Sequence, residues 1–438
     1  MIALSELAQA GRLAELRRRL EELGVVGVVD ELERTDRLTR ALAFRALRKD
    51  MAIEVFEDLD PALQRELLDG LREEVTFDLV DRLDPDDRAV LFDELPAKVA
   101  RKLLAELSEA ERAMTSILLG YPADSVGRRM SPEVFAVPVT ATADQALGMA
   151  RRAESAETVY TVPVLDEGRL VVGVVSLRRL LVTDGDTSVA EVMSDPVVVR
   201  ADTDAEEAAV MVREHGLVAI PVVDGEDRLL GVFTVDDAMR VLASEESEDL
   251  ARTGAAEPLT RPYLTTSVLG LVRSRAAWLT VLLVGAGLTV SVLDHFQESL
   301  EEVVALALFV PLLIGTGGNA GAQAATTVVR AMALGHVRFA DLPRVVGREV
   351  LTGAFLGATL ATIGFVPATL IAGAQLALVL AITMVAVCTL ATTAGSVTPM
   401  VARRLGVDPA VVSAPFITTF VDATGLIVYF LIAGAIIL

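Results

Sequence analysis

A single carboxylate stands deep inside the last of several long apolar stretches. Asp422 lies in the segment PFITTFVDATGLIVYF, which contains no Lys or Arg that could pair with it. An ionisable group at the centre of a bilayer costs at least ~2.5 kcal/mol and normally faces a cavity, a pore or a partner. A protonated, hydrogen-bonded acid is the alternative. The position of Asp422 favours a cation site within a membrane.

A glycine-rich run, VPLLIGTGGNAGAQAATTVVR at residues 310–330, is the second feature with chemical potential. Its glycines and Pro311 weaken a helix, by roughly 1 kcal/mol per glycine and more for proline. We therefore expect a broken span whose freed backbone carbonyls line a cavity. Close helix packing through small residues is the competing interpretation. The polar Asn319 and Gln323 favour the first, because they add neutral oxygen ligands.

One carboxylate among neutral oxygens suits a hard cation that keeps its water. Mg²⁺ dehydrates reluctantly and is commonly bound through one or two carboxylates, whereas Ca²⁺ takes about six to eight oxygens directly. Softer ions call for His or Cys. None of the three histidines lies deep in an apolar stretch, and Cys388 is the only cysteine. Mg²⁺ is the favoured ion, and Co²⁺ or Mn²⁺ at the same acid is the alternative.

Catalysis by the same acid finds no support in the sequence. An intramembrane aspartyl protease needs two carboxylates that share a proton. In the last three apolar stretches Asp422 has no second deep acid, because Glu349 and Asp408 lie at the edges. We therefore expect that the chain is not an enzyme.

The front of the chain is strongly acidic. The formal net charge is −22, and residues 276–438 hold only six basic and eight acidic residues. This leaves 33 of the 39 basic and 53 of the 61 acidic residues in residues 1–275, with a formal charge of −20. Such a field attracts cations and repels nucleic acid, which we exclude as a partner.

The acids of this front part gather in short clusters. Most charge runs are solvated helix faces. Acids on apposed domains repel one another, however, so a divalent cation that neutralises them draws the domains together. The clusters therefore predict an electrostatic switch that couples ion concentration to domain arrangement.

The chain divides into four parts by its texture. Short amphipathic helices are expected first, because apolar residues recur at helical spacing. A duplicated β-α-β segment follows, in which Met130 to Met193 is 63 residues and Gly173 to Gly231 is 58. A connector with a charged helical start comes next, and long apolar runs end the chain. The predicted parts are 1–122, a helical domain; 123–184 and 185–243, the two repeats; 244–270, the connecting helix; and 271–438, the membrane domain.

Five apolar runs reach about the 20 residues that cross a bilayer. They are residues 276–293, 303–331, 350–373, 375–401 and 410–438. The N-terminus has no signal peptide pattern and is expected in the cytoplasm. The loops at 332–349 and 402–409 then also face the cytoplasm. They carry five of the six arginines of residues 276–438, whereas the other loops between the apolar runs carry none. The positive-inside rule thus predicts five spans with the C-terminus outside.

The sequence resembles the MgtE magnesium channels over essentially its whole length. GGNAGAQAATTVVRAMALG and the later DPAVVSAPFITTFVDATGLIVYF look like the membrane signature of this family. The duplicated segment resembles its tandem CBS domains, residues 1–120 its N-domain, and 244–267 its plug helix. The resemblance implies a multi-pass homodimer in the lipid of the plasma (inner) membrane, which passes Mg²⁺ into the cytoplasm and closes when cytosolic Mg²⁺ is high.

The resemblance also implies roles for individual residues. Asp422 would be the pore acid that holds the hydration water of the ion, with Asn319, Gly318, Thr418 and Thr419 near the same pore. Regulatory Mg²⁺ would bind between the N-domain, the CBS pair and the plug helix. The predicted regulatory ligands are Glu54, Asp86, Asp87, Asp204, Glu206, Asp237, Glu248, Asp249 and Asp408.

Two positions depart from the family pattern. Val90 stands where relatives often have another acid, which weakens one regulatory site. The second CBS unit keeps Thr234 and Asp237 for a nucleotide ribose, but the first has Arg179 in the Asp place. ATP is therefore expected at the second unit at most. A membrane-anchored CBS nucleotide sensor is the alternative function, and Asp422 argues against it because a mere anchor needs no buried acid.

Overall fold

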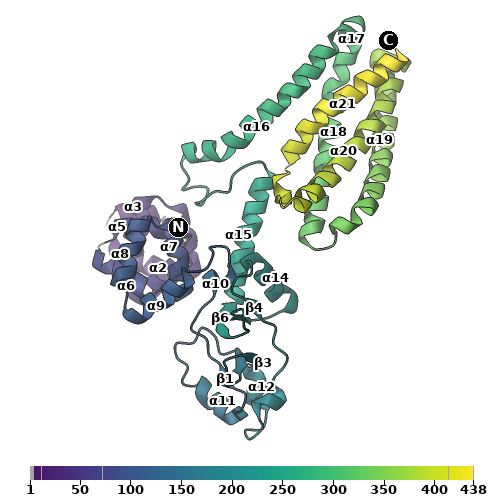
Figure 1. Ribbon diagram of the computed structural model, residues 1–438. Helices are drawn as coiled ribbons and strands as arrows, with labels where there is room; N and C mark the ends of the chain where they lie inside the picture. Colours follow the sequence, from purple (N-terminus) through teal and green to yellow (C-terminus); the bar gives the residue numbers. More distant parts are fainter. Residues whose placement is uncertain (1–3, 11, 72, 413, 438) are drawn as a thin grey trace. The chain divides into compact units, whose positions relative to one another are not determined.

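The computed structural model describes residues 4–10, 12–71, 73–412 and 414–437 (Figure 1). It divides into two compact units. The first comprises residues 1–245 with 260–266, and the second comprises 246–259 with 267–438. The first holds the helical domain and the CBS pair, and the second holds the apolar helices.

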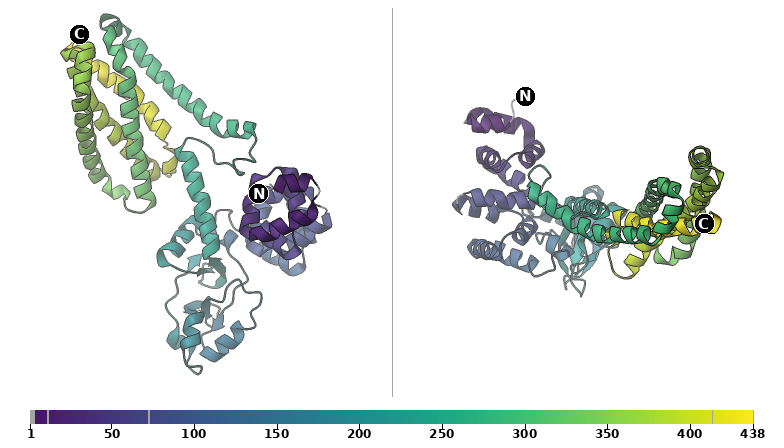
Figure 2. Two further views of the ribbon diagram at one scale, coloured as in Figure 1. Left: turned by 180° about the vertical axis from the view of Figure 1, so that it is seen from behind. Right: turned by 90° about the horizontal axis from the view of Figure 1, so that it is seen from above.

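The N-terminal part of the first unit is a stack of short helices (Figure 2). Their bounds are α1 Leu4–Gln9, α2 Leu13–Arg34, α3 Arg37–Ala46, α4 Lys49–Glu57, α5 Pro61–Gly70, α6 Glu73–Arg82, α7 Pro85–Glu94, α8 Ala97–Glu106 and α9 Glu109–Leu118. Leucines and Phe44 and Phe56 fill the core between them. This confirms the expected helical domain.

A 24-residue period, which sequence reading missed, organises this stack. The residues before α3, α5, α7 and α9 are Asp36, Asp60, Asp84 and Ser108, all N-cap types. A buried polar side chain also reaches the carbonyl eight residues earlier in three successive repeats: Arg40 to Leu32 at 2.9 Å, Gln64 to Phe56 at 2.6 Å and Arg88 to Val80 at 2.8 Å. The period escaped notice because Arg and Gln alternate at that position.

Asp84 breaks the pattern. The carboxylates of Asp36 and Asp60 accept backbone N–H groups of the helices that they precede, and so does the hydroxyl of Ser108. The side chain of Asp84 makes no such cap hydrogen bond. Its carboxylate is therefore available for another partner.

The predicted duplication is confirmed as two repeats of the same fold. The first contains α10 Val126–Arg129, β1 Val137–Pro138, α11 Ala143–Ala150, β2 Thr161–Leu165, β3 Val171–Ser176 and α12 Leu177–Val182. The second contains α13 Val189–Val192, β4 Val199–Arg200, α14 Ala205–His215, β5 Ala219–Val223, β6 Leu229–Thr234 and α15 Val235–Thr253. Each sheet pairs its first two strands in parallel and its last two antiparallel.

The repeats exchange their leading segments. Ser131 of the first donates its N–H to Val232 of the second at 2.8 Å, and Val174 of the first donates to Ser194 of the second at 3.0 Å. Met130 packs on Gly231, and Met193 packs on Gly173. Glycine is required at residue 231 because a Cβ there would lie 2.5 Å from the Ser131 carbonyl oxygen, and a Cβ at Gly173 would lie 2.4 Å from the Met193 sulfur.

Among the described residues of the second unit, five helices are long and apolar enough to cross a membrane. The elements are α16 Val268–His295, α17 Gln297–Glu302, the 3₁₀ helix η1 Val304–Phe309, α18 Val310–Ala333, η2 Phe339–Asp341, α19 Leu342–Ala372, α20 Ala374–Arg404, η3 Pro409–Val411 and α21 Ala414–Ile436. The expected five spans are thus confirmed, and the connecting segment is helical only to Thr253.

The expected break in the glycine-rich span is wrong. Helix α18 runs continuously through the run, and Pro311 lies in its first turn, where proline costs no hydrogen bond. The glycines instead permit close packing. A Cβ at Gly321 would lie 2.8 Å from Ile417 of α21, and one at Gly395 of α20 would lie 2.2 Å from the carbonyl oxygen of Gly321. Helix contacts repay the weak helix propensity of this sequence.

Candidate cation sites

The membrane carboxylate lies where α18 approaches α21. A Cβ at Gly318 would lie 3.1 Å from Thr418 Cγ2 and 3.6 Å from Asp422 Oδ1. Gly318 therefore lets α18 approach both side chains closely, where a larger residue would press on them. Asp422 is half-buried, and among the residues that the structure describes no basic side chain forms an ion pair with it.

The other predicted pore residues differ in how close they lie to Asp422. The hydroxyls of Thr418 and Thr419 both donate to the Pro415 carbonyl, at 2.8 and 2.9 Å, so their oxygens keep acceptor capacity. Thr419 also contacts α16, since a Cβ at Gly285 would lie 3.0 Å from Thr419 Cγ2. Asn319 follows Gly318 on α18 and is exposed. The geometry thus brings Gly318, Thr418 and Asp422 together.

The first unit contains an acidic cavity of about 530 Å³ between the helical domain and the second CBS repeat. Among the described residues, its lining contains thirteen carboxylates and only two arginines, Arg129 and Arg240. The carboxylates are Glu33, Glu57, Asp58, Asp60, Asp86, Asp87, Asp93, Glu94, Asp124, Asp204, Glu206, Asp237 and Glu245. Val90 also lines the cavity. This is the position at which relatives are expected to carry another acid.

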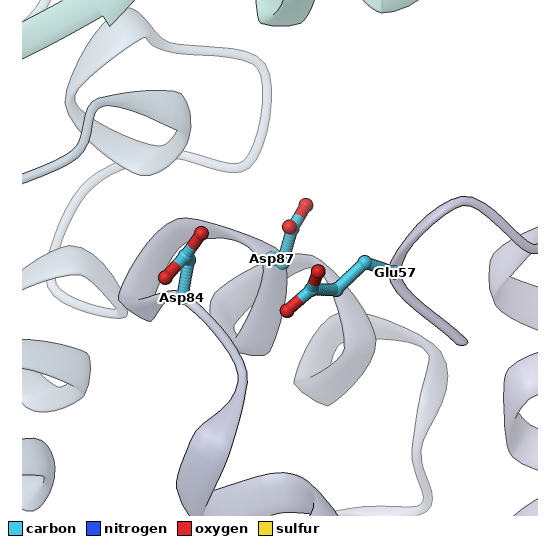
Figure 3. A group of neighbouring side chains, drawn as sticks. All are labelled: Glu57, Asp84 and Asp87. Atoms are coloured by element: carbon cyan, nitrogen blue, oxygen red, sulfur yellow. The ribbon is translucent and has the colours of Figure 1, made fainter. Parts of the chain in front are cut away.

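Three carboxylates at the edge of the helical domain converge closely enough to share one ion (Figure 3). Glu57 comes from the end of α4, Asp84 from the position before α7, and Asp87 from the first turn of α7. One oxygen of each lies within 4.8 Å of the others. The uncapped Asp84 thus directs its carboxylate toward Glu57 and Asp87 in place of its own helix.

Burial and mutual repulsion make the cavity carboxylates weak acids. Burial, followed by the neighbouring Asp84 and Asp87, raises the pKa of Glu57 to about 8. Burial likewise raises the pKa of Asp87 to about 7 against the attraction of Arg240. The pKa of Asp86 is also raised, first by burial and then by Asp237 and Asp87. These acids are held at a cost that a bound cation would relieve.

Asp86 gives the most direct sign that the cavity fits a cation. The residue is 6% exposed, and its Oδ1 atom has no hydrogen-bond partner among the described residues. Burying a carboxylate oxygen without a hydrogen-bond partner incurs the full desolvation penalty of that group. Hard oxygen ligands of this kind suit Mg²⁺.

Asp204 and Asp237 enter the same cavity with structural duties of their own. Asp204 Oδ1 accepts the Glu206 N–H at 2.8 Å and so caps α14. Thr234 donates its hydroxyl to Asp237 Oδ2 at 2.6 Å, so the two residues predicted to hold a ribose contact each other. In the first repeat, the corresponding Ser176 accepts the N–H of the exposed Arg179.

The predicted regulatory acids thus fall into three groups. Asp86, Asp87, Asp204, Glu206 and Asp237 line the cavity. Glu248, Asp249 and Asp408 lie in the second unit, where Arg252 forms ion pairs with Glu248 and Asp408. Burial and then Asp408 raise the pKa of Asp249. Glu54 is exposed on α4 and is not among the described residues that line the cavity.

Sequence reasoning missed Glu57 and Asp58 of this cavity, and Asp84, which converges with Glu57 and Asp87. The 24-residue period would have found two of them. Glu33 and Glu57 occupy equivalent places, as do Asp60 and Asp84, so each repeat delivers carboxylates to the same side of the stack. Reasoning by acidic clusters alone could not separate these from solvated neighbours.

Comparison with known proteins gives matches along the whole organisation. The family model MgtE, described as a divalent cation transporter, matches residues 310–432; the model of the MgtE intracellular N domain matches 23–124; and CBS domains match 124–184 and 189–244. The chain is 41% identical to "Magnesium transporter MgtE" of Thermus thermophilus, covering 74% of this chain and 72% of the relative. It is 36% identical to the protein of the same name from Enterococcus faecalis, covering 72% and 70%.

A solved structure resembles the first unit. The cytosolic domain of the Mg²⁺ channel MgtE in complex with ATP matches with a TM-score of 0.51 and 36% identity, covering 55% of this chain and 98% of that one. The match agrees with the arrangement of a helical domain followed by two CBS repeats.

Proposed function

The chain belongs to the MgtE family, and from this premise we propose that it carries Mg²⁺ across a membrane past Asp422 and closes when Mg²⁺ fills the acidic cavity. Five apolar helices make it a multi-pass membrane protein. The observation that carries the transport site is the half-buried carboxylate of Asp422, which Gly318 of α18 approaches closely and which has no basic ion-pair partner among the described residues.

Asp422 acts on the ion through retained water. A single carboxylate beside threonine oxygens is too small a ligand set to replace the shell of Mg²⁺, which commonly keeps several waters. Conduction also requires binding that is weak enough for the ion to leave. A lone carboxylate without a basic partner meets both demands, and Co²⁺ or Mn²⁺ of similar charge are the competing cargo.

Closure by Mg²⁺ follows from the electrostatics of the cavity. The helical domain supplies Asp86 and Asp87, and the second CBS repeat supplies Asp237, so the two domains repel each other at this joint when ionised. Divalent cations remove the repulsion and favour the compact arrangement. High cytosolic Mg²⁺ would then act through the plug segment of α15.

The oligomer, topology and nucleotide site form the rest of the proposal. All of α16 lies in the described part of the chain and none of its residues is buried within it, which favours a homodimer. The arginines of loops 332–349 and 402–409 favour a cytoplasmic N-terminus, an outer C-terminus and the inner membrane. The Thr234–Asp237 pair favours ATP at the second CBS repeat, as does the ATP complex of the relative.

Flux into liposomes tests the transport site. With a Mg²⁺ indicator inside, Asp422→Ala and Asp422→Asn should abolish uptake, because both remove the charge that holds the hydrated ion. Asp341→Asn, which neutralises an acid of the short helix η2, is the matched control and should transport normally. Uptake by Asp422→Asn at the wild-type rate would refute the role of the carboxylate.

Removal of residues 1–243 tests the cavity as the sensor. The truncated protein should take up Mg²⁺ at high Mg²⁺ on the cytoplasmic side, where the full chain is closed. Closure that survives the truncation would place the sensor elsewhere. Competition by Co²⁺ and Mn²⁺ in the same assay separates the cargo ions.

A further inference from the structure

Arg240 reaches three carboxylates from both sides of the acidic cavity. Its Nη1 atom lies 3.3 Å from Asp87 Oδ1 and its Nη2 atom lies 3.3 Å from Asp58 Oδ1, both in the helical domain. The same Nη1 atom lies 3.4 Å from Asp237 Oδ1, one turn earlier on α15. A single guanidinium therefore connects the helical domain to the second CBS repeat.

The surroundings of Arg240 are those expected for a bound cation. The side chains of Asp87 and Asp237 are 20% and 12% exposed, so the positive charge meets largely desolvated partners. Thirteen carboxylates line the cavity against two arginines among the described residues. The field at this point is therefore strongly negative, and whichever cation sits there gains from it.

An arginine differs from a metal ion in two ways that matter here. It stays charged at any physiological pH and it cannot leave, so its contribution does not depend on ion concentration. Its planar fork also offers separate N–H groups to separate carboxylates, whereas carboxylate oxygens coordinate a metal ion directly.

We propose that Arg240 is a tethered cation that occupies one cation position of the acidic cavity and holds the helical domain on the second CBS repeat before any Mg²⁺ binds. This inference deepens the proposed closure by Mg²⁺ and rests on it. Its consequence is a sensor that is partly assembled at low Mg²⁺ and that needs fewer ions to finish closing.

Proteolysis of the full-length protein in detergent tests the proposal. Trypsin reports the population of the open joint when opening is fast relative to cleavage. Arg240→Gln should be cut at least ~5-fold faster than wild type in EDTA, since a coupling of about 1 kcal/mol corresponds to that factor. Arg228→Gln is the matched control, because Arg228 belongs to the same repeat but pairs with Glu226 in its own loop.

Magnesium separates a lost cation from a lost fold. Saturating Mg²⁺ should restore the protection of Arg240→Gln, and equilibrium dialysis should find one additional Mg²⁺ bound per chain. Arg240→Lys should give intermediate protection in EDTA. If Mg²⁺ protects the wild type but fails to restore the protection of Arg240→Gln, with unchanged stoichiometry, Arg240 is only a structural side chain and the proposal is overturned.

The same measurements keep the two proposals apart. If Arg240→Gln and Arg228→Gln are cut equally in EDTA while Mg²⁺ still protects the wild type, the tethered cation is refuted and closure by Mg²⁺ stands. If Mg²⁺ protects none of the proteins while Arg240→Gln alone is cut faster in EDTA, closure by Mg²⁺ is refuted and the tether between the domains is retained.

Discussion

The two cation sites of this protein handle charge in opposite ways. In the membrane unit one carboxylate, Asp422, lies close to Gly318 without a basic partner in the described residues. In the first unit thirteen described carboxylates crowd one cavity and repel each other. Few ligands let an ion pass, whereas many ligands make occupancy depend steeply on ion concentration. The contrast separates conduction from sensing.

A larger side chain at Gly318 should have the largest effect. Gly318→Val would push methyl groups against Thr418 and Asp422, where even a Cβ lies at 3.1 and 3.6 Å. We expect Mg²⁺ uptake into liposomes to fall at least ~10-fold, since overpacking of this kind costs 1–3 kcal/mol.

Gly315→Val is the control on the same helix, because a Cβ at Gly315 meets nothing within 4 Å. Equal uptake by both variants would mean that the close approach of Gly318 to Asp422 does not matter for the ion path.

Substituting two glutamates of α4 one at a time tests which of them belongs to the Mg²⁺-sensing cavity. Glu57 belongs to the three-carboxylate cluster, whereas Glu54 is exposed and outside the described lining of the cavity. Glu57→Gln should raise the Mg²⁺ concentration for closure by ~5-fold, the factor for about 1 kcal/mol of coupling. Glu54→Gln should leave it unchanged. The midpoint of Mg²⁺ protection from trypsin measures both.

The opposite ranking would favour the family resemblance over this geometry. The resemblance points to Glu54 as a ligand. The structure instead points to Glu57, one turn later on α4, because the side chain of Glu54 is exposed. A large shift for Glu54→Gln alone would show that the helical domain rearranges when Mg²⁺ binds.

Apolar length and internal similarity carried most of the fold from the sequence. The five spans follow from hydropathy because lipid admits few alternatives, and the CBS pair follows from its own repetition. The continuous α18 could not be predicted from propensity. Its glycines are stabilised by contacts with Ile417, Gly395 and Val421 on other helices, which a local reading does not contain.

The candidate sites divide in the same manner. Asp422 was found because a charge in an apolar run is conspicuous. Glu57 and Asp84 were missed because their function depends on the 24-residue stacking of the repeats and on Asp84 failing to cap its helix. Such a role is visible only when the helices are assembled.

Protons should compete with Mg²⁺ for the carboxylates of the cavity. Glu57 has a pKa of about 8 and Asp87 one of about 7 in the folded state, above their ordinary values of 4.5 and 3.8. The folded protein therefore holds more protons than the unfolded chain between those values, and without divalent ions its stability falls as pH rises through that window.

Mg²⁺ binding to the cavity should consequently release protons and tighten as pH rises. Between about pH 6.5 and about pH 8.5 the apparent affinity should increase ~10-fold, one displaced proton giving up to tenfold per pH unit. Calorimetry in buffers of different ionisation enthalpy measures the released protons. Glu57→Gln should flatten the pH dependence, and an unchanged profile would contradict the assignment of the titrating group.

The smallest effect concerns a hydroxyl group of the protein that already donates a hydrogen bond to a cavity carboxylate. Thr234 is 4% exposed and donates its hydroxyl to Asp237. Thr234→Val removes a hydrogen bond to a charged group, and the apparent melting temperature in EDTA should fall by ~2–4 °C. Thr183→Val, whose hydroxyl bonds only the neutral carbonyl of Arg179 among described partners, should change it less.

Added Mg²⁺ should narrow the difference between Thr234→Val and wild type, because the ion supplies the compensation that the lost hydroxyl gave to Asp237. If the difference instead persists at saturating Mg²⁺, the hydroxyl stabilises the repeat independently of the cavity charge. Asp237 would then belong to the fold of the second CBS repeat more than to the sensor, and the contrast between a crowded sensing site and a sparse conducting site would rest on Asp86 and Asp87.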